Sequence, residues 1–171
     1  MITDFLLDHS ALVPTALVLV ALGCAAVGYA ALRSRTYGPR ALRALAAVSL
    51  LAALALTLAP TGRTSPTRGC TVQFDLPTLG SVELLANVAL LLPATLFVAL
   101  ATRRPVLAAV SGSVLSVAIE AVQSQVTAIG RACDTNDWAM NSLGVLAGAL
   151  AAGALLALTA TTTVSRRPGG R

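Results

Sequence analysis

The sequence has little charge and few aromatic side chains for its length. Of its 171 residues, 11% are charged, 4% are aromatic and 56% are hydrophobic. A soluble domain usually carries about 25% charged residues, and one soluble core of this size could not bury so many Leu, Ala and Val side chains. A bilayer can surround them, because lipid tails are as apolar as the side chains that face them. The composition therefore predicts an integral membrane protein.

Lysine is absent, and the twelve basic residues are all arginine, which gives a net charge of +5. No basic stripe with interleaved aromatic residues occurs, so nucleic-acid binding is not expected. Arginines beside apolar spans instead set the orientation of membrane helices and contact anionic lipid. The first arginine is Arg33, so the first apolar stretch lacks the basic region of a cleaved signal peptide and should remain as a helix.

Histidine occurs once, at His9, and no G-x-S-x-G turn is present. Ser-His-Asp catalysis is therefore not expected. The acidic residues have oxygen ligands that suit Mg²⁺ or Ca²⁺, but their spacing matches no recognised metal site. We predict neither a metal nor a cofactor.

Five apolar stretches are long enough, or nearly so, to cross a membrane, which takes about 20 residues. They lie at approximately 12–32, 41–59, 84–102, 106–122 and 137–162. None alternates polar and apolar residues as the strands of a membrane barrel do. The sequence predicts an all-α, polytopic transmembrane helical bundle with five spans. A single domain should cover 1–164, followed by a basic cytoplasmic tail over 165–171.

The placement of charge predicts the orientation of the bundle. Nine arginines fall on one side of the membrane, namely Arg33, Arg35, Arg40, Arg43, Arg103, Arg104, Arg166, Arg167 and Arg171, and three fall on the other, namely Arg63, Arg68 and Arg131. The positive-inside rule then places the N-terminus outside and the C-terminus in the cytoplasm. All seven acids map to the outer side: Asp4, Asp8, Asp75, Glu83, Glu120, Asp134 and Asp137. Because acids contribute little to orientation, this distribution points to a polar site on the outer surface.

The three cysteines have different expected roles. Cys24 lies inside the first span and should be a small buried hydrophobe. Cys70 and Cys133 lie in the two outer loops, where a disulfide can form and persist. We predict a Cys70–Cys133 bond that ties the long loop after the second span to the start of the fifth helix; two free thiols are the alternative.

Three polar clusters lie near the outer ends of the last three spans. Glu83 and Asn87 are four residues apart and share a helical face, and so do Glu120 and Gln123 at a spacing of three. The third cluster comprises Arg131, Asp134, Asp137 and Asn141, followed by Gly144 and Gly148.

In the third cluster, the acids and the glycines share one helical face. At about 100° per residue, an arc of roughly 80° holds Asp134, Asp137, Asn141, Gly144 and Gly148. The Gly144-x-x-x-Gly148 spacing allows a neighbouring helix to approach closely. Close packing on this face should bring the acids near Glu83 and Glu120.

Simpler interpretations of these residues remain open. Asp134 or Asn136 can serve only as a helix cap. Arg131 can pair with Asp134 in a solvated loop, where an ion pair contributes about 0–1 kcal/mol. Glu120 is harder to explain structurally, because an ionisable group at the centre of a span costs about 2.5–3.5 kcal/mol. Its position near the end of the span lowers that cost.

The order of these clusters resembles the VanZ-like family of bacterial membrane proteins. The similarity covers roughly residues 40–158, and its most specific stretch is RACDTNDWAMNSLGVLAG. The resemblance implies a multi-pass protein of the bacterial cytoplasmic membrane with a role in the cell envelope. The founding member of the family is associated with resistance to the glycopeptide teicoplanin. That role is not carried over, since many relatives occur without a resistance cluster.

Together these observations predict an outward-facing binding site. Its expected ligand contacts are Glu120, Arg131, Asp134, Asp137 and Asn141, with support from Glu83, Asn87 and Gln123. The expected partners are membrane lipids and a polar envelope component, such as a lipid headgroup, a lipid-linked cell-wall precursor or a glycopeptide. The main alternative is a membrane-embedded acid–base enzyme that acts on a lipid-linked substrate. A transporter is a weaker alternative, because the inner halves of the spans carry almost no ionisable groups. A purely structural assembly partner is the last alternative.

Overall fold

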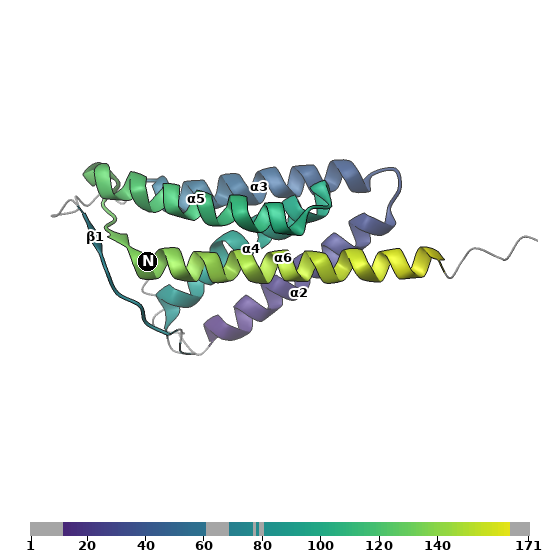
Figure 1. The fold of residues 1–171 in the computed structure, drawn as a ribbon, viewed down its shortest axis with the longest axis horizontal. Helices are drawn as coiled ribbons and strands as arrows, with labels where there is room; N and C mark the ends of the chain where they lie inside the picture. The colour runs from purple at the N-terminus through teal and green to yellow at the C-terminus, as the bar shows by residue number, and fades with distance from the viewer. Residues whose placement is uncertain (1–11, 61–68, 77, 79–80, 165–171) are drawn as a thin grey trace, which may run out of the picture.

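The computed structural model describes residues 12–60, 69–76, 78 and 81–164, with side chains up to residue 161. The described chain forms five long helices: α2 (Val13–Arg33), α3 (Gly38–Leu58), α4 (Val82–Thr102), α5 (Pro105–Gln125) and α6 (Thr135–Val164). Each of the five is long and apolar enough to cross a membrane. The all-α bundle with five spans is therefore confirmed (Figure 1).

Some sequence predictions fall outside the described residues. They concern Asp4, Asp8, His9, Arg63, Arg68 and the basic tail over 165–171. The orientation of the bundle across the membrane and the division into a domain and a tail also stay predictions.

Proline and a carboxylate mark where several of the helices begin. Pro14, Pro39 and Pro105 occupy the first turns of α2, α3 and α5, where the missing N–H has no helical partner and the fixed φ suits a helix. Helix α6 begins directly after Asp134, whose side chain accepts a hydrogen bond from the backbone N–H of Asn136. Local sequence therefore fixes the entry of the chain into four of the spans.

Helix α4 is the centre of the bundle, since it packs against α2, α3, α5 and α6. Its residues Leu91, Leu96 and Leu100 are almost completely inaccessible. A helix that is apolar around its whole circumference is typically buried. The other four helices leave large apolar side chains exposed, such as Leu19 and Val114, and lipid tails would cover that surface.

Helices α4 and α6 approach each other closely at two glycines. A Cβ atom at Gly144 would collide with the carbonyl oxygen of Val88, and one at Gly148 would collide with that of Leu92. Both collisions would be with the backbone of α4 rather than with flexible side chains. The predicted close contact at the Gly144-x-x-x-Gly148 spacing is confirmed, and α4 is the neighbouring helix.

The two ends of the bundle carry opposite charges. The first turns of α4 and α6 and the last turn of α5 meet at one end, here called the acidic end, which holds the described acids Asp75, Glu83, Glu120, Asp134 and Asp137. The turns between α2 and α3 and between α4 and α5 lie at the opposite end, here called the arginine end, with Arg33, Arg35, Arg40, Arg43, Arg103 and Arg104.

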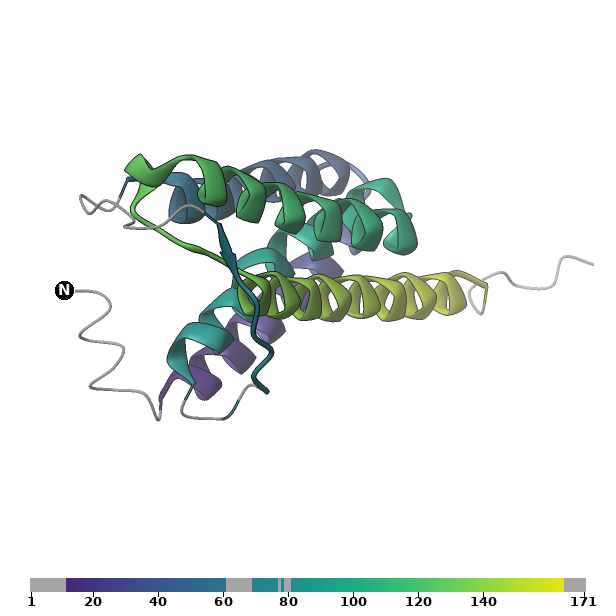
Figure 2. The same ribbon diagram turned by 60° about the vertical axis from the view of Figure 1, so that its left-hand side comes forward.

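A short pair of strands lies at the acidic end. Strand β1 (Cys70–Thr71) pairs in parallel with β2 (Cys133–Asp134), with Cys70 opposite Cys133. The predicted Cys70–Cys133 disulfide is present, with Cα atoms 4.5 Å apart and a sequence separation of 63. The remaining cysteine, Cys24, is a free thiol. Strand β1 and the residues that follow it, 70–76, are here called the β1 segment. In Figure 2 the β1 segment runs across the beginning of α6.

Candidate functional site

Glu120 connects the end of α5 to the beginning of α6. Its side chain is only 6% exposed, and its Oε2 atom accepts a hydrogen bond of 3.0 Å from the backbone N–H of Asp134. This hydrogen bond holds strand β2 against α5.

Asp134 caps helix α6 and also binds the β1 segment. Its Oδ1 atom accepts the backbone N–H of Asn136 at 2.8 Å, and its Oδ2 atom accepts the side-chain amide of Gln73 at 2.6 Å. The first N–H groups of a helix lack intrahelical partners, and a capping carboxylate satisfies one of them. The capping interpretation of Asp134 is thus confirmed, and Arg131 is not among the hydrogen-bond partners of its side chain within the described residues.

Asp137 joins α6 to α4 at the same end. Its Oδ1 atom accepts a hydrogen bond from the side-chain amide of Asn87. The carboxylate is half-buried, and the charges of Asp134, Glu83 and Arg131 all act on it. Close approach of α4 and α6 at the two glycines therefore brings these acids together, as their shared helical face predicted.

The β1 segment covers the beginning of α6 and adds contacts that the sequence did not reveal. The backbone N–H of Gln73 donates to Thr135 Oγ1 at 3.0 Å, and that hydroxyl donates to the Gln73 carbonyl at 2.9 Å. Asp75 donates its backbone N–H to Asn136 Oδ1 at 3.1 Å. The predicted disulfide was the signal that could have found them, because pairing the two cysteines places residues 71–75 beside 134–136.

A cavity of about 550 Å³ opens beside this network at the acidic end. It is lined by Gln73, Asp75, Leu76, Thr78, Ser81, Val82, Glu83, Leu84 and Asn136. Among the described residues, the lining contains two carboxylates and several hydroxyl and amide groups but no basic side chain. Its chemistry therefore suits a ligand that presents amine or hydroxyl donors.

Of the eight predicted site residues, Glu83 lines this cavity and the other seven do not. Asn141 is one turn deeper along α6 and only 2% exposed, and its Oδ1 atom has no hydrogen-bond partner among the described residues. Gln123 is 6% exposed and donates its side-chain amide to the carbonyl of Thr57 at 3.0 Å, which joins α5 to α3. Arg131 is exposed in the segment between α5 and α6.

A second unpartnered polar group lies level with Asn141 in the α5–α6 interface. Gly112 of α5 faces Val145 of α6, and Glu120 contacts the beginning of α6 at Asp134. Because the helices are antiparallel, Ser116 of α5 falls at the depth of Asn141. Ser116 is fully buried, and its hydroxyl oxygen has no partner. A polar seam therefore continues inward from the acidic end.

The acids at this end repel one another and are held by donors from the chain. Charges of Asp134 and Asp137 both act on Glu120, and such repulsion is stronger where water is partly excluded. The amides of Asn87 and Gln73 and the backbone N–H of Asp134 partly offset it. Among the described residues, no three His, Cys, Asp or Glu side chains are arranged to hold a metal ion.

Comparison with known proteins gives the family of the chain. A family model described as VanZ/LLP1 matches residues 40–157, well over half of the sequence. This range agrees with the predicted similarity over 40–158 and includes α4, α5 and the part of α6 that lies at the acidic end. No curated protein and no solved structure matches the chain. With five apolar helices and this match, the chain is a multi-pass membrane protein that belongs to the VanZ/LLP1 family.

Proposed function

We propose that this protein binds a polar component of the bacterial cell envelope at its acidic end. The cavity with Asp75 and Glu83 in its lining is the observation that carries the proposal. Ligands of the expected kind are a lipid headgroup, a lipid-linked cell-wall precursor or a glycopeptide. Of these, the carboxylates favour a ligand with an amine or several hydroxyl groups, because the cavity offers mainly hydrogen-bond acceptors.

Two features support an outward orientation of the acidic end. The Cys70–Cys133 disulfide lies there, and disulfides persist in oxidising surroundings outside the cytoplasm. The described arginines of the loops are concentrated at the opposite end, except for Arg131, as the positive-inside rule expects of a cytoplasmic face. Both observations point the same way although they depend on unrelated chemistry.

The polar residues divide into a scaffold and a cavity lining. Glu120, Asp134 and Asp137 are engaged by donors from neighbouring elements. They hold α4, α5, α6 and the β1 segment in place. Glu83 and Asp75 line the cavity, and Glu83 is also close enough to Asp137 for its charge to act there. In this proposal the scaffold presents Glu83 and Asp75 to the ligand.

Arg131 adds a cation beside the acids. Its charge acts on Asp137, and its side chain is exposed. A guanidinium group binds phosphate or carboxylate through paired hydrogen bonds. A ligand that carries both an amine and a phosphate or carboxylate could therefore pair with the carboxylates and with Arg131 at the same time.

The test is to identify what the purified protein carries. Wild-type protein and a Glu83→Gln variant would be extracted in mild detergent, and bound lipids and precursors would be identified by mass spectrometry. We expect one envelope component to be enriched over the bulk membrane lipid with the wild type and to be lost with Glu83→Gln. Gln125→Ala is the control, because Gln125 is exposed at the same end but does not line the cavity.

Three outcomes would contradict the proposal. One is that no component is enriched with the wild type. Another is that Glu83→Gln and Gln125→Ala reduce the enrichment equally. The third is conversion of a lipid-linked substrate to a product by the purified protein, which would favour the enzyme alternative.

A further inference from the structure

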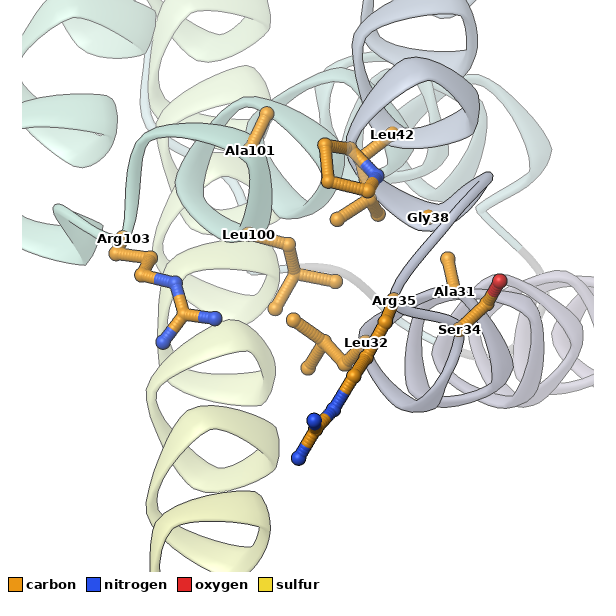
Figure 3. A pocket seen from close by; sticks show the side chains of 10 residues that line it. Ala31, Leu32, Ser34, Arg35, Gly38, Leu42, Leu100, Ala101 and Arg103 are labelled. Atoms are coloured by element: carbon orange, nitrogen blue, oxygen red, sulfur yellow. The ribbon is translucent and has the colours of Figure 1, made fainter.

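A second cavity, of about 330 Å³, lies at the arginine end of the bundle. It is formed where the turn between α2 and α3 meets the end of α4 (Figure 3). Leu32, Leu42 and Leu100 supply most of its apolar wall, and Arg35 and Arg103 supply its two charges. It lies at the other end of the spans from the acidic cavity, so the two are separate sites.

Arg35 and Arg103 have no internal side-chain partner in the described part of the chain, whereas Arg33 and Arg43 at the same end do. Arg33 stacks over the ring of Tyr29 at 5.9 Å from its centroid, and Arg43 donates to the carbonyl of Pro39 at 3.1 Å. Figure 3 shows Arg35 and Arg103 on either side of the Leu32 and Leu100 side chains. Their guanidinium groups extend in the same general direction, and none of the described residues that line the cavity is acidic.

The backbone at Arg103 supplies an independent reason to assign it a ligand. Its φ is 57°, and it is the only residue other than glycine with a positive φ among the described residues. A left-handed conformation costs an L-residue roughly 1–2 kcal/mol, and glycine is the usual choice at the end of a helix. Attraction to the helix dipole explains why a basic residue lies at this end of α4. It does not explain why that residue is the one with the left-handed backbone.

The depth of the cavity indicates which anion would bind. It lies where α2 and α4 end and α3 begins, so it sits at the headgroup level of the membrane if the helices span it. Apart from the two arginines and Ser34, the side chains that line the cavity are apolar. A free inorganic phosphate would leave that wall exposed to water, whereas a phospholipid would cover it with its glycerol and first acyl carbons.

We propose that the cavity between Arg35 and Arg103 binds an anionic phospholipid of the adjacent leaflet, with its phosphate held between the two guanidinium groups. Arginine binds phosphate oxygens through paired, charge-assisted hydrogen bonds. Gly38 keeps the turn close to α2, since a Cβ there would collide with the Ala31 carbonyl. The site thus ties the first two helices to the central one through a lipid.

The test compares two double variants with the same change in charge. Arg35→Gln with Arg103→Gln removes the cavity arginines, and Arg40→Gln with Arg104→Gln removes two exposed arginines of the same end that do not line it. Each protein would be placed in nanodiscs of phosphatidylcholine with a minor share of phosphatidylglycerol. Native mass spectrometry would then measure which lipids stay bound.

The wild type should retain phosphatidylglycerol in preference to phosphatidylcholine. The cavity variant should lose roughly 30-fold of this preference, because it removes the paired, charge-assisted hydrogen bonds to the phosphate. The control variant removes only surface charge and should keep most of the preference. An Arg103→Gly variant separates binding from folding, because it should raise thermal stability by relieving the backbone while it lowers the preference.

Three results would overturn the proposal. Equal losses in the two double variants would mean that bulk positive charge alone attracts the lipid. The absence of any preference in the wild type would remove the site. Displacement of the lipid by millimolar inorganic phosphate would assign the cavity to the free ion.

Discussion

Replacement of Gly144 by alanine should weaken the bundle more than any other single methyl group added along α6. The new Cβ would collide with the backbone carbonyl oxygen of Val88 on α4. A helix backbone cannot rotate aside as a flexible side chain can, so α4 and α6 would have to separate. Because Gly148 meets the same helix one turn further along at Leu92, the separation would loosen both contacts.

The magnitude follows from two opposing effects. Overpacking a well-packed interface costs about 1–3 kcal/mol, and the upper part of that range applies when backbone must move. Alanine in place of glycine within a helix returns about 0.5–1 kcal/mol. The net loss for Gly144→Ala is therefore about 2 kcal/mol.

Gly153→Ala on the same helix is the matched control. Its added Cβ would meet only Pro105 Cγ, at 4.0 Å, an ordinary contact distance. It should leave stability unchanged or raise it by up to about 1 kcal/mol. The two variants should differ by about 2–3 kcal/mol, or roughly 4–12 °C in melting temperature. Thermal unfolding of both proteins in one detergent measures this difference.

Equal melting temperatures for Gly144→Ala and Gly153→Ala would refute the reasoning. That result would mean that α4 and α6 do not approach closely at Gly144. It would also remove the basis for placing Asp137 beside Asn87, since the same approach creates that hydrogen bond.

Three other substitutions have directions set by a disulfide, a buried hydrogen bond and an unpartnered hydroxyl group. Cys70→Ser should lower stability by about 4 kcal/mol at most, since the disulfide closes a loop with a sequence separation of 63. Wild-type protein under reducing conditions should melt at the same temperature as the variant. Unequal melting temperatures would mean that the serine itself is disruptive. Glu120→Ala should lower the free energy of unfolding by about 1–3 kcal/mol, because it leaves the N–H of Asp134 without its acceptor. A loss below about 0.5 kcal/mol, the lower limit for one hydrogen bond, would show that this contact is dispensable. Ser116→Ala should leave the melting temperature equal or higher, because the buried hydroxyl oxygen has no partner to lose; a clear decrease would indicate a bound water.

The helices and their closest contact could be predicted because each rests on a pattern within one segment. Long apolar runs locate the five spans, and the spacing of Gly144 and Gly148 identifies the face of α6 that packs most closely. The two outer cysteines could be paired because few partners exist. The same helical face placed Asp137 near Glu83, and the structure brings their charges together.

The cavity linings could not be predicted, because they depend on segments that have no periodic pattern. Strands β1 and β2 have two residues each, which is too short for any alternation of polar and apolar residues. Gln73 and Asn136 become neighbours only when these strands pair. Likewise, the turn that presents Arg35 and the left-handed end of α4 at Arg103 meet only in the folded bundle.

The position of the disulfide has a consequence for the connectivity of the molecule. Cys70 precedes α4 and Cys133 follows α5. The disulfide therefore closes α4, α5 and the turn between them into a covalent ring. A protease that cut after Arg103, within that ring, would break the chain without releasing a fragment. The two pieces would travel as one species until a reductant separated them.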